Sequence, residues 1–347
     1  MKSMNHKNQE NKLQLLSKNL KQIGLLTSAL ITMTSCSKND EPIEQVAVSP
    51  ATAAQFASVR ETALQQLTQN FTATAGSGEV VLTSEKGVKI KINTNNLTKN
   101  GNPVTGSFDI KYVEIFDKGH MLSTNKSTMG KMPDGINLGI MKSGGEFYLN
   151  ATQGGVQLAT DNMIGTLKLE VPATLTGAVD SGMTFWTGVT TDPENIVWNR
   201  KDGGQVGFNQ VPTGATNGYN VTFGNFGWSN IDRLYNLPGV KTQILATAPT
   251  GYNETNSAIY FSLDGEGTNQ LAKFDVYNPT TMQFSEHYGQ IPIGQACHLI
   301  FASAEGSQWR YAVKAVIVAA GVATNFTLAE TVVGSESQMV AAINAIQ

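Results

Sequence analysis

Short runs in which apolar and polar side chains alternate recur along most of this chain. In VKIKI, Val88, Ile90 and Ile92 would face one way and the two lysines between them the other. An alternation of period two is typical of a strand that buries one face. Similar runs follow at intervals of roughly 8–15 residues and are separated by short turns rich in glycine and asparagine. The pattern predicts an all-β protein built from antiparallel sandwiches.

The strand runs fall into two groups, which predict two consecutive immunoglobulin-like β-sandwich domains. We assign residues 76–238 to the first domain and residues 239–347 to the second. The aromatic and turn residues of segment 223–239 indicate a junction between the two groups. ESQMVAAINAI, residues 336–346, is predicted to close the chain as a short amphipathic helix.

One helix is predicted ahead of the first strand. Ser49 can cap it, Pro50 suits the first helical position, and the pattern extends to residue 70. Its apolar residues recur at spacings of three and four: Phe56, Val59, Ala63 and Leu67. This apolar stripe must be covered, so we expect segment 49–75 to dock on the first domain, a partner protein being the alternative.

Residues 1–35 have the layout of a signal peptide. A lysine-rich start precedes IGLLTSALITM at residues 23–33, an uncharged run of 11 residues. That run is shorter than the about 20 residues of a membrane-spanning helix. Thr34 and Ser35 then lead to Cys36. This resembles a lipobox, which implies acylation of Cys36, although Met33 stands where lipoboxes usually have leucine; an ordinary signal peptide with an incidental cysteine is the alternative.

The residues after Cys36 include a second predicted targeting signal. We expect residues 36–48 to be a disordered tether. Its SKNDE sequence, with Lys38, Asp40 and Glu41, resembles the export signal of some Gram-negative bacterial lipoproteins. The resemblance implies a protein anchored by lipid in the outer membrane and exposed on the cell surface, the periplasmic face being the alternative. The membrane, reached through the N-terminal lipid, is therefore an expected partner.

The charge balance argues against nucleic acid as a partner. Without the five lysines and one glutamate of residues 1–35, the 24 basic and 27 acidic residues become 19 and 26, so the net charge changes from −3 to −7. Nucleic-acid binding depends on lysine and arginine that neutralise phosphates. We therefore predict no nucleic-acid partner.

A family resemblance covers residues 78–158. Here a turn of the type N-G-x-P-V-x-G at residues 100–106 is followed by a strand that contains Glu114, and then by GGEFYLNA at residues 144–151. This order resembles a ZU5-like β-sandwich region of uncharacterised bacterial surface lipoproteins. The resemblance implies a fold and a cell-surface setting, and it assigns no functional residue.

The sequence shows no catalytic, cofactor or metal motif. Its histidines are isolated from one another: His6, His120, His287 and His298. No GxSxG, P-loop or GxGxxG motif follows a strand run. Cys297 lies in the apolar run ACHLIFA, so a buried, unreactive thiol is expected. We therefore predict that the protein is not an enzyme and holds no cofactor or metal.

Neighbouring carboxylates were the remaining candidates for catalysis. Glycosidases use two carboxyl groups about 5–10 Å apart. Three pairs are close in sequence: Glu114 with Asp117, Asp192 with Glu194, and Asp264 with Glu266. Such pairs arise by chance in a chain with many acids, so we predict no catalytic use. The loop DGEGTN at residues 264–269 lacks the spacing of an EF-hand, and a solvated hairpin is expected there rather than a calcium site.

Trp228 is the single, weak candidate for ligand binding. It is flanked by glycine in GNFGWSN, and carbohydrate-binding sandwiches stack sugars on exposed rings. A plug at the domain junction is the alternative interpretation. The leading hypothesis is a lipid-anchored surface protein with a non-enzymatic binding or structural role, whose partner is a surface glycan or a protein. An accessory carbohydrate-capturing lipoprotein and a secreted hydrolase are the alternatives.

Overall fold

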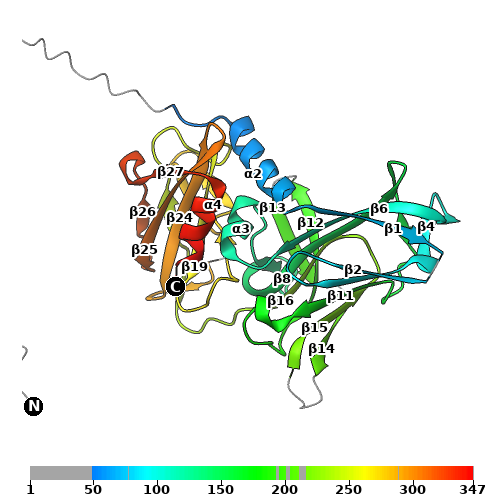
Figure 1. Cartoon of the computed structure of the whole chain (residues 1–347). Coiled ribbons are helices and arrows are strands. Elements are labelled where there is room, and N and C mark those ends of the chain that lie inside the picture. Colours follow the sequence, from blue (N-terminus) through cyan, green and yellow to red (C-terminus); the bar gives the residue numbers. More distant parts are fainter. Residues whose placement is uncertain are drawn as a thin grey trace, which may run out of the picture. The chain divides into compact units, whose positions relative to one another are not determined.

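We describe a computed structural model of the chain, in which residues 49–346 are described except 77, 193–194, 201–203, 211–215 and 288. Strands are the main regular elements and only three α-helices occur among the described residues, which confirms the all-β class (Figure 1). The predicted leader, tether, lipidation site and export signal lie outside the described residues.

The first half of the chain forms two large sheets and one small one. Sheet A has eight strands: β1 (Gln69–Ala75), β6 (Gly106–Ile115), β8 (Leu138–Gln153), β16 (Gly227–Leu234), β12 (Thr184–Asp192), β13 (Asn195–Arg200) and β7 (Met129–Lys131) in this order, with β9 (Val156–Gln157) paired to β8. Sheet B has the order β14 (Gly204–Gln210), β15 (Thr216–Phe223), β11 (Leu167–Pro172), β3 (Lys89–Asn93) and β2 (Glu79–Thr83). Sheet C consists of β10 (Ala159–Thr160), β4 (Leu97–Lys99) and β5 (Asn102–Pro103).

Sheets A and B pack on each other through a hydrophobic cluster. Phe108, Ile110 and Leu149 come from sheet A, and Ile90 and Leu169 from sheet B. In β3 the apolar residues are buried while Lys89 is exposed and Lys91 half-buried, which confirms the predicted alternation. The pleat of each strand thus gives one face to this cluster.

The second half of the chain forms sheets D, E and F. Sheet F has the order β20 (Ala272–Lys273), β19 (Ser257–Leu263), β24 (Ala296–Glu305), β25 (Gln308–Ile317) and β27 (Val332–Gly334). Sheet E has β21 (Val276–Asn278), β22 (Gln283–Ser285), β18 (Leu245–Thr247) and β26 (Ala323–Asn325), and sheet D pairs β17 (Lys241–Thr242) with β23 (Ile291–Pro292). Phe261 and Phe301 of sheet F share a cluster with Ala246 and Phe284 of sheet E.

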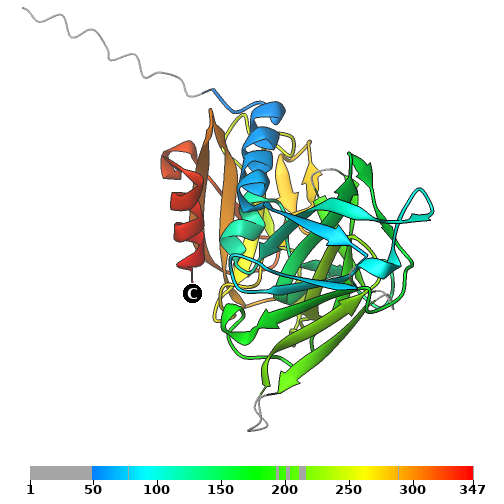
Figure 2. The same ribbon diagram turned by 45° about the vertical axis from the view of Figure 1, so that its right-hand side comes forward.

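Three α-helices gather where the two halves meet (Figures 1 and 2). They are α2 (Ala53–Leu67), α3 (Lys118–Ser123) and α4 (Glu336–Asn344), and α3 contacts both of the others. Three short 3-10 turns complete the elements: η1 (Thr94–Asn96), η2 (Ala173–Leu175) and η3 (Leu328–Glu330). α2 starts later than predicted because Thr52, not Ser49, forms the capping box with Gln55.

Three features of the local structure differ from the sequence predictions. Residues 69–75, which we included in the helical segment, form β1, paired with β6. Segment 223–239 is not simply a junction, because its residues Gly227–Leu234 form β16 in the middle of sheet A. The strands of the first half are also interrupted by α3, which the strand pattern did not predict.

The buried clusters cross the predicted domain boundary at 238/239. One of them, which we call the shared cluster, joins Phe56, Val113 and Met121 to Tyr260 and Trp309. Residues 49–347 also form one compact unit. Two consecutive immunoglobulin-like sandwiches are therefore not confirmed.

Candidate functional site

Trp228, the predicted ligand-binding residue, is half-buried in an aromatic group on one face of sheet A. Its ring centroid lies 5.3 Å from that of Tyr148 and 6.5 Å from that of Trp198. The ammonium of Lys126 lies 5.4 Å from the centre of the Trp228 ring. Most of this ring therefore packs against protein, and Trp228 lines only part of a cavity described below.

Each histidine in the described part of the chain contacts an aspartate rather than another histidine. Nδ1 of His120 lies 2.7 Å from Asp117 Oδ2, and Nδ1 of His298 lies 2.7 Å from Asp264 Oδ1. His287 pairs in the same way with Asp275. Burial acts to raise the pKa of Asp117, but the hydrogen bonds from His120 outweigh it and lower this pKa to about 2. Among the described residues no three histidine, cysteine or acidic side chains gather as a metal site.

Cys297 is fully buried in β24, as predicted. Burial raises the pKa of its thiol to about 12, and the nearby Asp264 adds to the shift. Because the thiolate is the reactive form, this thiol is held in its unreactive state at neutral pH.

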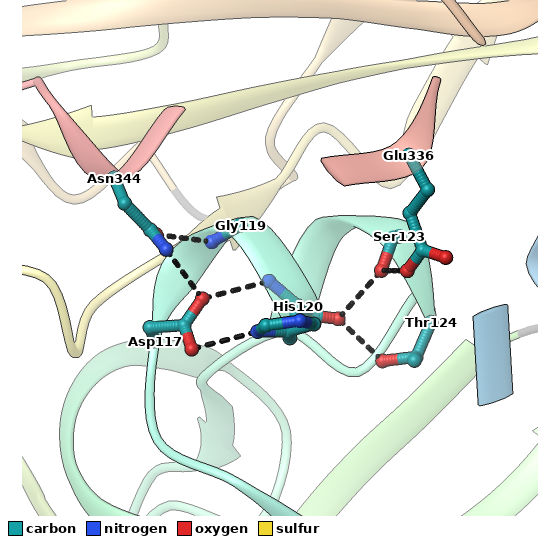
Figure 3. Close-up of polar contacts among 7 residues, drawn as sticks. All are labelled: Asp117, Gly119, His120, Ser123, Thr124, Glu336 and Asn344. Carbon is teal, nitrogen blue, oxygen red and sulfur yellow. Dashed lines mark hydrogen bonds and ion pairs between the residues drawn. The ribbon is translucent and has the colours of Figure 1, made fainter. Parts of the chain in front are cut away.

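Two of the three acid pairs singled out from the sequence serve local contacts. Glu114 accepts hydrogen bonds from Ser84 Oγ at 2.7 Å and from Lys86 N at 3.0 Å, and so fastens the β2–β3 turn to sheet A. Asp117 caps α3 (Figure 3). In the third pair, Asp264 contacts His298 and Glu266 accepts a hydrogen bond from Tyr235 at 2.6 Å. Glu194, from the remaining pair, lies outside the described residues.

Sequence reasoning missed a different carboxyl pair, Glu146 and Asp232, which is completely buried on β8 and β16. The register of these strands passes from Asn230 opposite Glu146 to Asp232 opposite Ser143, so β8 contains an extra residue at Gly144–Gly145. Such a bulge re-aims the side chain that follows it. The two glycines of the GGEF sequence could have indicated this bulge, since Gly145 has a φ of 129°, a backbone conformation that favours glycine.

Burial is the main cause of the pKa shifts of this pair. It raises the pKa of Glu146 well above the usual value, and the nearby Asp232 adds to this, while Lys126 opposes it. Burial likewise raises the pKa of Asp232. Both side chains are 0% exposed, so a substrate has no access to them in this conformation.

The largest cavity that we describe is a groove of about 440 Å³ beside the β15–β16 turn. We call it the amide groove, because its lining includes four side-chain amides, a hydroxyl group and an aromatic ring: Asn150, Gln157, Asn162, Asn225, Thr160 and Phe226. None of the described residues that line it is charged. Its volume is within the range of small-molecule sites.

Hydrogen bonds fix the walls of the amide groove. Gln157 Nε2 donates to Leu158 O at 3.0 Å, to Ala151 O at 3.2 Å and to Asn150 Oδ1. Thr160 Oγ1 donates to Gly224 O, which ties β10 to the β15–β16 turn. Asn162 is in the left-handed region at a φ of 62°, a conformation that asparagine tolerates better than most residues.

A second cavity of about 240 Å³ adjoins the amide groove and shares Asn225, Phe226 and Gly227 with it. Trp228 lines this second cavity together with Phe185. Trp228, the candidate from the sequence, thus lines a cavity beside the amide groove. Sequence reasoning missed the amides because they are spread from residue 150 to residue 225 and converge only in the fold.

Comparison with protein-family models, with curated proteins and with solved structures finds no match for this chain. Within the described part of the chain, the helices are too short or too polar to cross a membrane.

Proposed function

We propose that this protein is a lipid-anchored cell-surface protein that binds an uncharged glycan, without catalysis, in the amide groove. The lining of the groove carries this proposal: four carboxamides, one hydroxyl and one phenyl ring, with no charge among the described lining residues. A carboxamide carries both donors and acceptors, which suit the hydroxyl groups of a sugar. Gln157 Nε2 is engaged within the protein, so the donors for a ligand would come from the asparagines of the groove. An aromatic ring packs against the apolar face of a sugar ring.

The proposed anchor suits capture at the cell surface. Acylation of Cys36 would hold the chain in the outer membrane, and Lys38, Asp40 and Glu41 would direct it outward. A tether of residues 36–48 would span up to roughly 45 Å if fully extended. The folded part could then reach glycans beyond the lipid head groups. The periplasmic face of the membrane remains the alternative location.

We also propose that sheets A with B, and E with F, represent two immunoglobulin-like sandwiches that share an interface. The packing of these sheet pairs in separate hydrophobic clusters supports this view. The amide groove would belong to the first sandwich, at the β15–β16 turn.

The burial of Glu146 and Asp232 supports a non-enzymatic role. Glycoside hydrolysis needs two carboxyl groups that flank a bound substrate. Glu146 and Asp232 are the buried pair, and neither is among the residues that line the four cavities described for this chain. A hydrolase would require a rearrangement that opens sheet A to substrate.

Binding to a panel of neutral and acidic oligosaccharides tests the proposal. We expect calorimetric titration of the full-length protein in detergent to show saturable binding of a neutral oligosaccharide. Phe226→Ala and Asn225→Ala should each weaken it about tenfold or more, a loss of about 1.4 kcal/mol. Asn102→Ala, an exposed asparagine outside the groove, is the matched control. Absence of any neutral ligand, or equal affinity of all three variants, would contradict the proposal.

A further inference from the structure

The cavity of about 240 Å³ beside the amide groove has a different lining from the groove itself. We call it the aromatic cavity, because three phenylalanines line it: Phe185, Phe223 and Phe226. We propose that the aromatic cavity receives an acetamido group of the bound glycan. The ligand class then narrows to neutral glycans that contain N-acetylated sugars. This inference rests on the proposed function of the amide groove.

The aromatic cavity is continuous with the amide groove. Asn225, Phe226 and Gly227 line both of them. Gly227 has a φ of 125°, and a Cβ added there would meet no atom within 4 Å outside its two chain neighbours. The backbone at Gly227 thus leaves open space where the two cavities meet. One ligand can therefore extend from the groove into the aromatic cavity.

The inner wall of the aromatic cavity is apolar. The rings of Phe185 and Phe223 stack with their centroids 5.6 Å apart and an angle of 25° between their planes. Val189 follows Phe185 by four residues on β12, so both side chains lie on the same face of the strand. None of the described lining residues is charged. Such a wall favours a methyl group, whose removal from water is favourable, over a sugar hydroxyl group.

The outer part of the aromatic cavity is open to solvent. Val189 is 37% exposed and Asn225 is exposed. Thr187 and Phe226 are half-buried. These four side chains are therefore within reach of a ligand that arrives from outside, without a rearrangement of the strands.

Two polar side chains of the aromatic cavity complement an amide. Thr187 Oγ1 donates to Asn199 O at 3.5 Å, and its oxygen retains lone pairs that can accept from the N–H of an acetamido group. The exposed carboxamide of Asn225 carries N–H donors for the acetamido carbonyl.

An acetamido group combines the three features that this lining matches: a methyl group, an N–H donor and a carbonyl acceptor. A hydroxyl group lacks the methyl group, and an alkyl chain lacks the polar atoms. A carboxylate would bring a negative charge to a cavity whose described lining has no cation.

Diacetylchitobiose and cellobiose test this inference, because they have the same linkage and differ in carrying an acetamido or a hydroxyl group on the second carbon of each ring. Each is titrated calorimetrically into the full-length protein in an amine-oxide detergent, which contains no sugar. We expect diacetylchitobiose to bind about tenfold more tightly or better, as is typical when a methyl group fills an apolar pocket.

Two variants locate the preference in the aromatic cavity. Val189→Asp places a carboxylate on the apolar wall and should weaken diacetylchitobiose binding about tenfold. Thr187→Val removes the hydroxyl group at similar size and should weaken it about fivefold. Both variants should bind cellobiose like the parent, because the amide groove is unchanged. Val81→Asp, an exposed valine of β2 outside both cavities, is the matched control and should bind both disaccharides like the parent.

The outcomes separate this inference from the proposed function. Equal affinity for the two disaccharides, or tighter binding of cellobiose, would overturn the acetamido assignment and leave the glycan proposal intact. A preference for butyl over methyl glucoside with equal affinity for the disaccharides would assign the cavity to an alkyl chain instead. Unchanged preference for diacetylchitobiose in folded Val189→Asp and Thr187→Val proteins would also overturn the assignment. Absence of binding by every neutral oligosaccharide would overturn both proposals.

Discussion

Glu146 and Asn230 lie directly opposite each other on β8 and β16, yet neither carboxyl oxygen of Glu146 accepts a hydrogen bond from any residue that the structure describes. Asn230 instead donates its amide to Asp232 at 2.6 Å. The bulge at Gly144–Gly145 thus places a carboxyl group in the interior without the partners that a buried acid usually has.

This arrangement predicts that Glu146→Gln stabilises the protein at neutral pH. Burial raises the pKa of Glu146 in the folded state above its unfolded value. The folded state therefore binds the proton of the Glu146 carboxyl group more tightly than the unfolded state does. The stabilisation by this bound proton is present at low pH and is lost as the pH rises through the folded-state pKa. Glutamine cannot ionise, so the variant should gain about 1–3 kcal/mol at pH 8 and little at pH 4.

Urea unfolding at both pH values measures this effect. Glu85→Gln, an exposed glutamate, serves as the control and should unfold like the parent at each pH. If the difference between Glu146→Gln and the parent were the same at both pH values, Glu146 would not be the titrating group that we infer.

Lys118 is a second completely buried charge, and here the partners are present. Its Nζ donates to Ile346 O at 2.7 Å, Gly267 O at 3.1 Å and Ser262 Oγ at 3.2 Å. Lys118→Met would leave these oxygens without their donor, and we expect a loss of about 3 kcal/mol in the free energy of unfolding. Lys131→Met, on the surface, should change it by less than about 0.5 kcal/mol. Similar denaturation midpoints for the two variants would contradict the anchoring role of Lys118.

Elements with a one-sided hydrophobic pattern could be predicted from the sequence. In β3 the alternation of isoleucine and lysine matches the alternation of buried and outward-facing positions. In α2 the predicted stripe supplies the buried residues Phe56, Val59 and Ala63. Such patterns depend only on the period of the backbone and on contact with one apolar surface.

Elements buried on both faces could not be predicted in this way. In β16 four successive residues, Ser229 to Asp232, are buried, and three of them are polar. Their polarity and the preceding glycines resemble a loop. α3 has six residues and depends on α4, more than 200 residues away, for its contacts, so no local pattern marks it. The amide groove likewise combines residues from distant segments.

The lipobox hypothesis predicts that Cys36→Ala releases the protein from membranes, because the acyl chains would be its anchor. Cys297→Ala is the matched control, since these are the two cysteines of the chain. Immunoblots of membrane and soluble fractions should show the Cys36 variant in the soluble fraction or medium and the Cys297 variant in the membrane fraction. Retention of the Cys36 variant in membranes would refute the lipid anchor.

The export-signal hypothesis makes an independent prediction about Lys38, Asp40 and Glu41. Replacing all three with alanine should leave the protein acylated and membrane-bound but protected from protease added to intact cells. A periplasmic protein and disrupted cells provide the controls for cell integrity and for protease activity. Equal digestion of the parent and the triple variant on intact cells would remove these residues as the signal and leave the role of Cys36 unaffected.

The shared cluster leads to a prediction about the fragment of residues 240–347. The sequence alone predicts that the chain after Gly239, residues 240–347, folds by itself, since it has its own strands and closing helix. In the structure, however, Tyr260 and Trp309 are buried in one cluster with Phe56, Val113 and Met121, which the fragment lacks. Exposing this face should leave the fragment aggregated or without a cooperative thermal transition, whereas residues 49–347 should melt as one unit. A soluble fragment with a β-type circular dichroism spectrum and a single sharp transition would show instead that the division at 238/239 marks two autonomous domains.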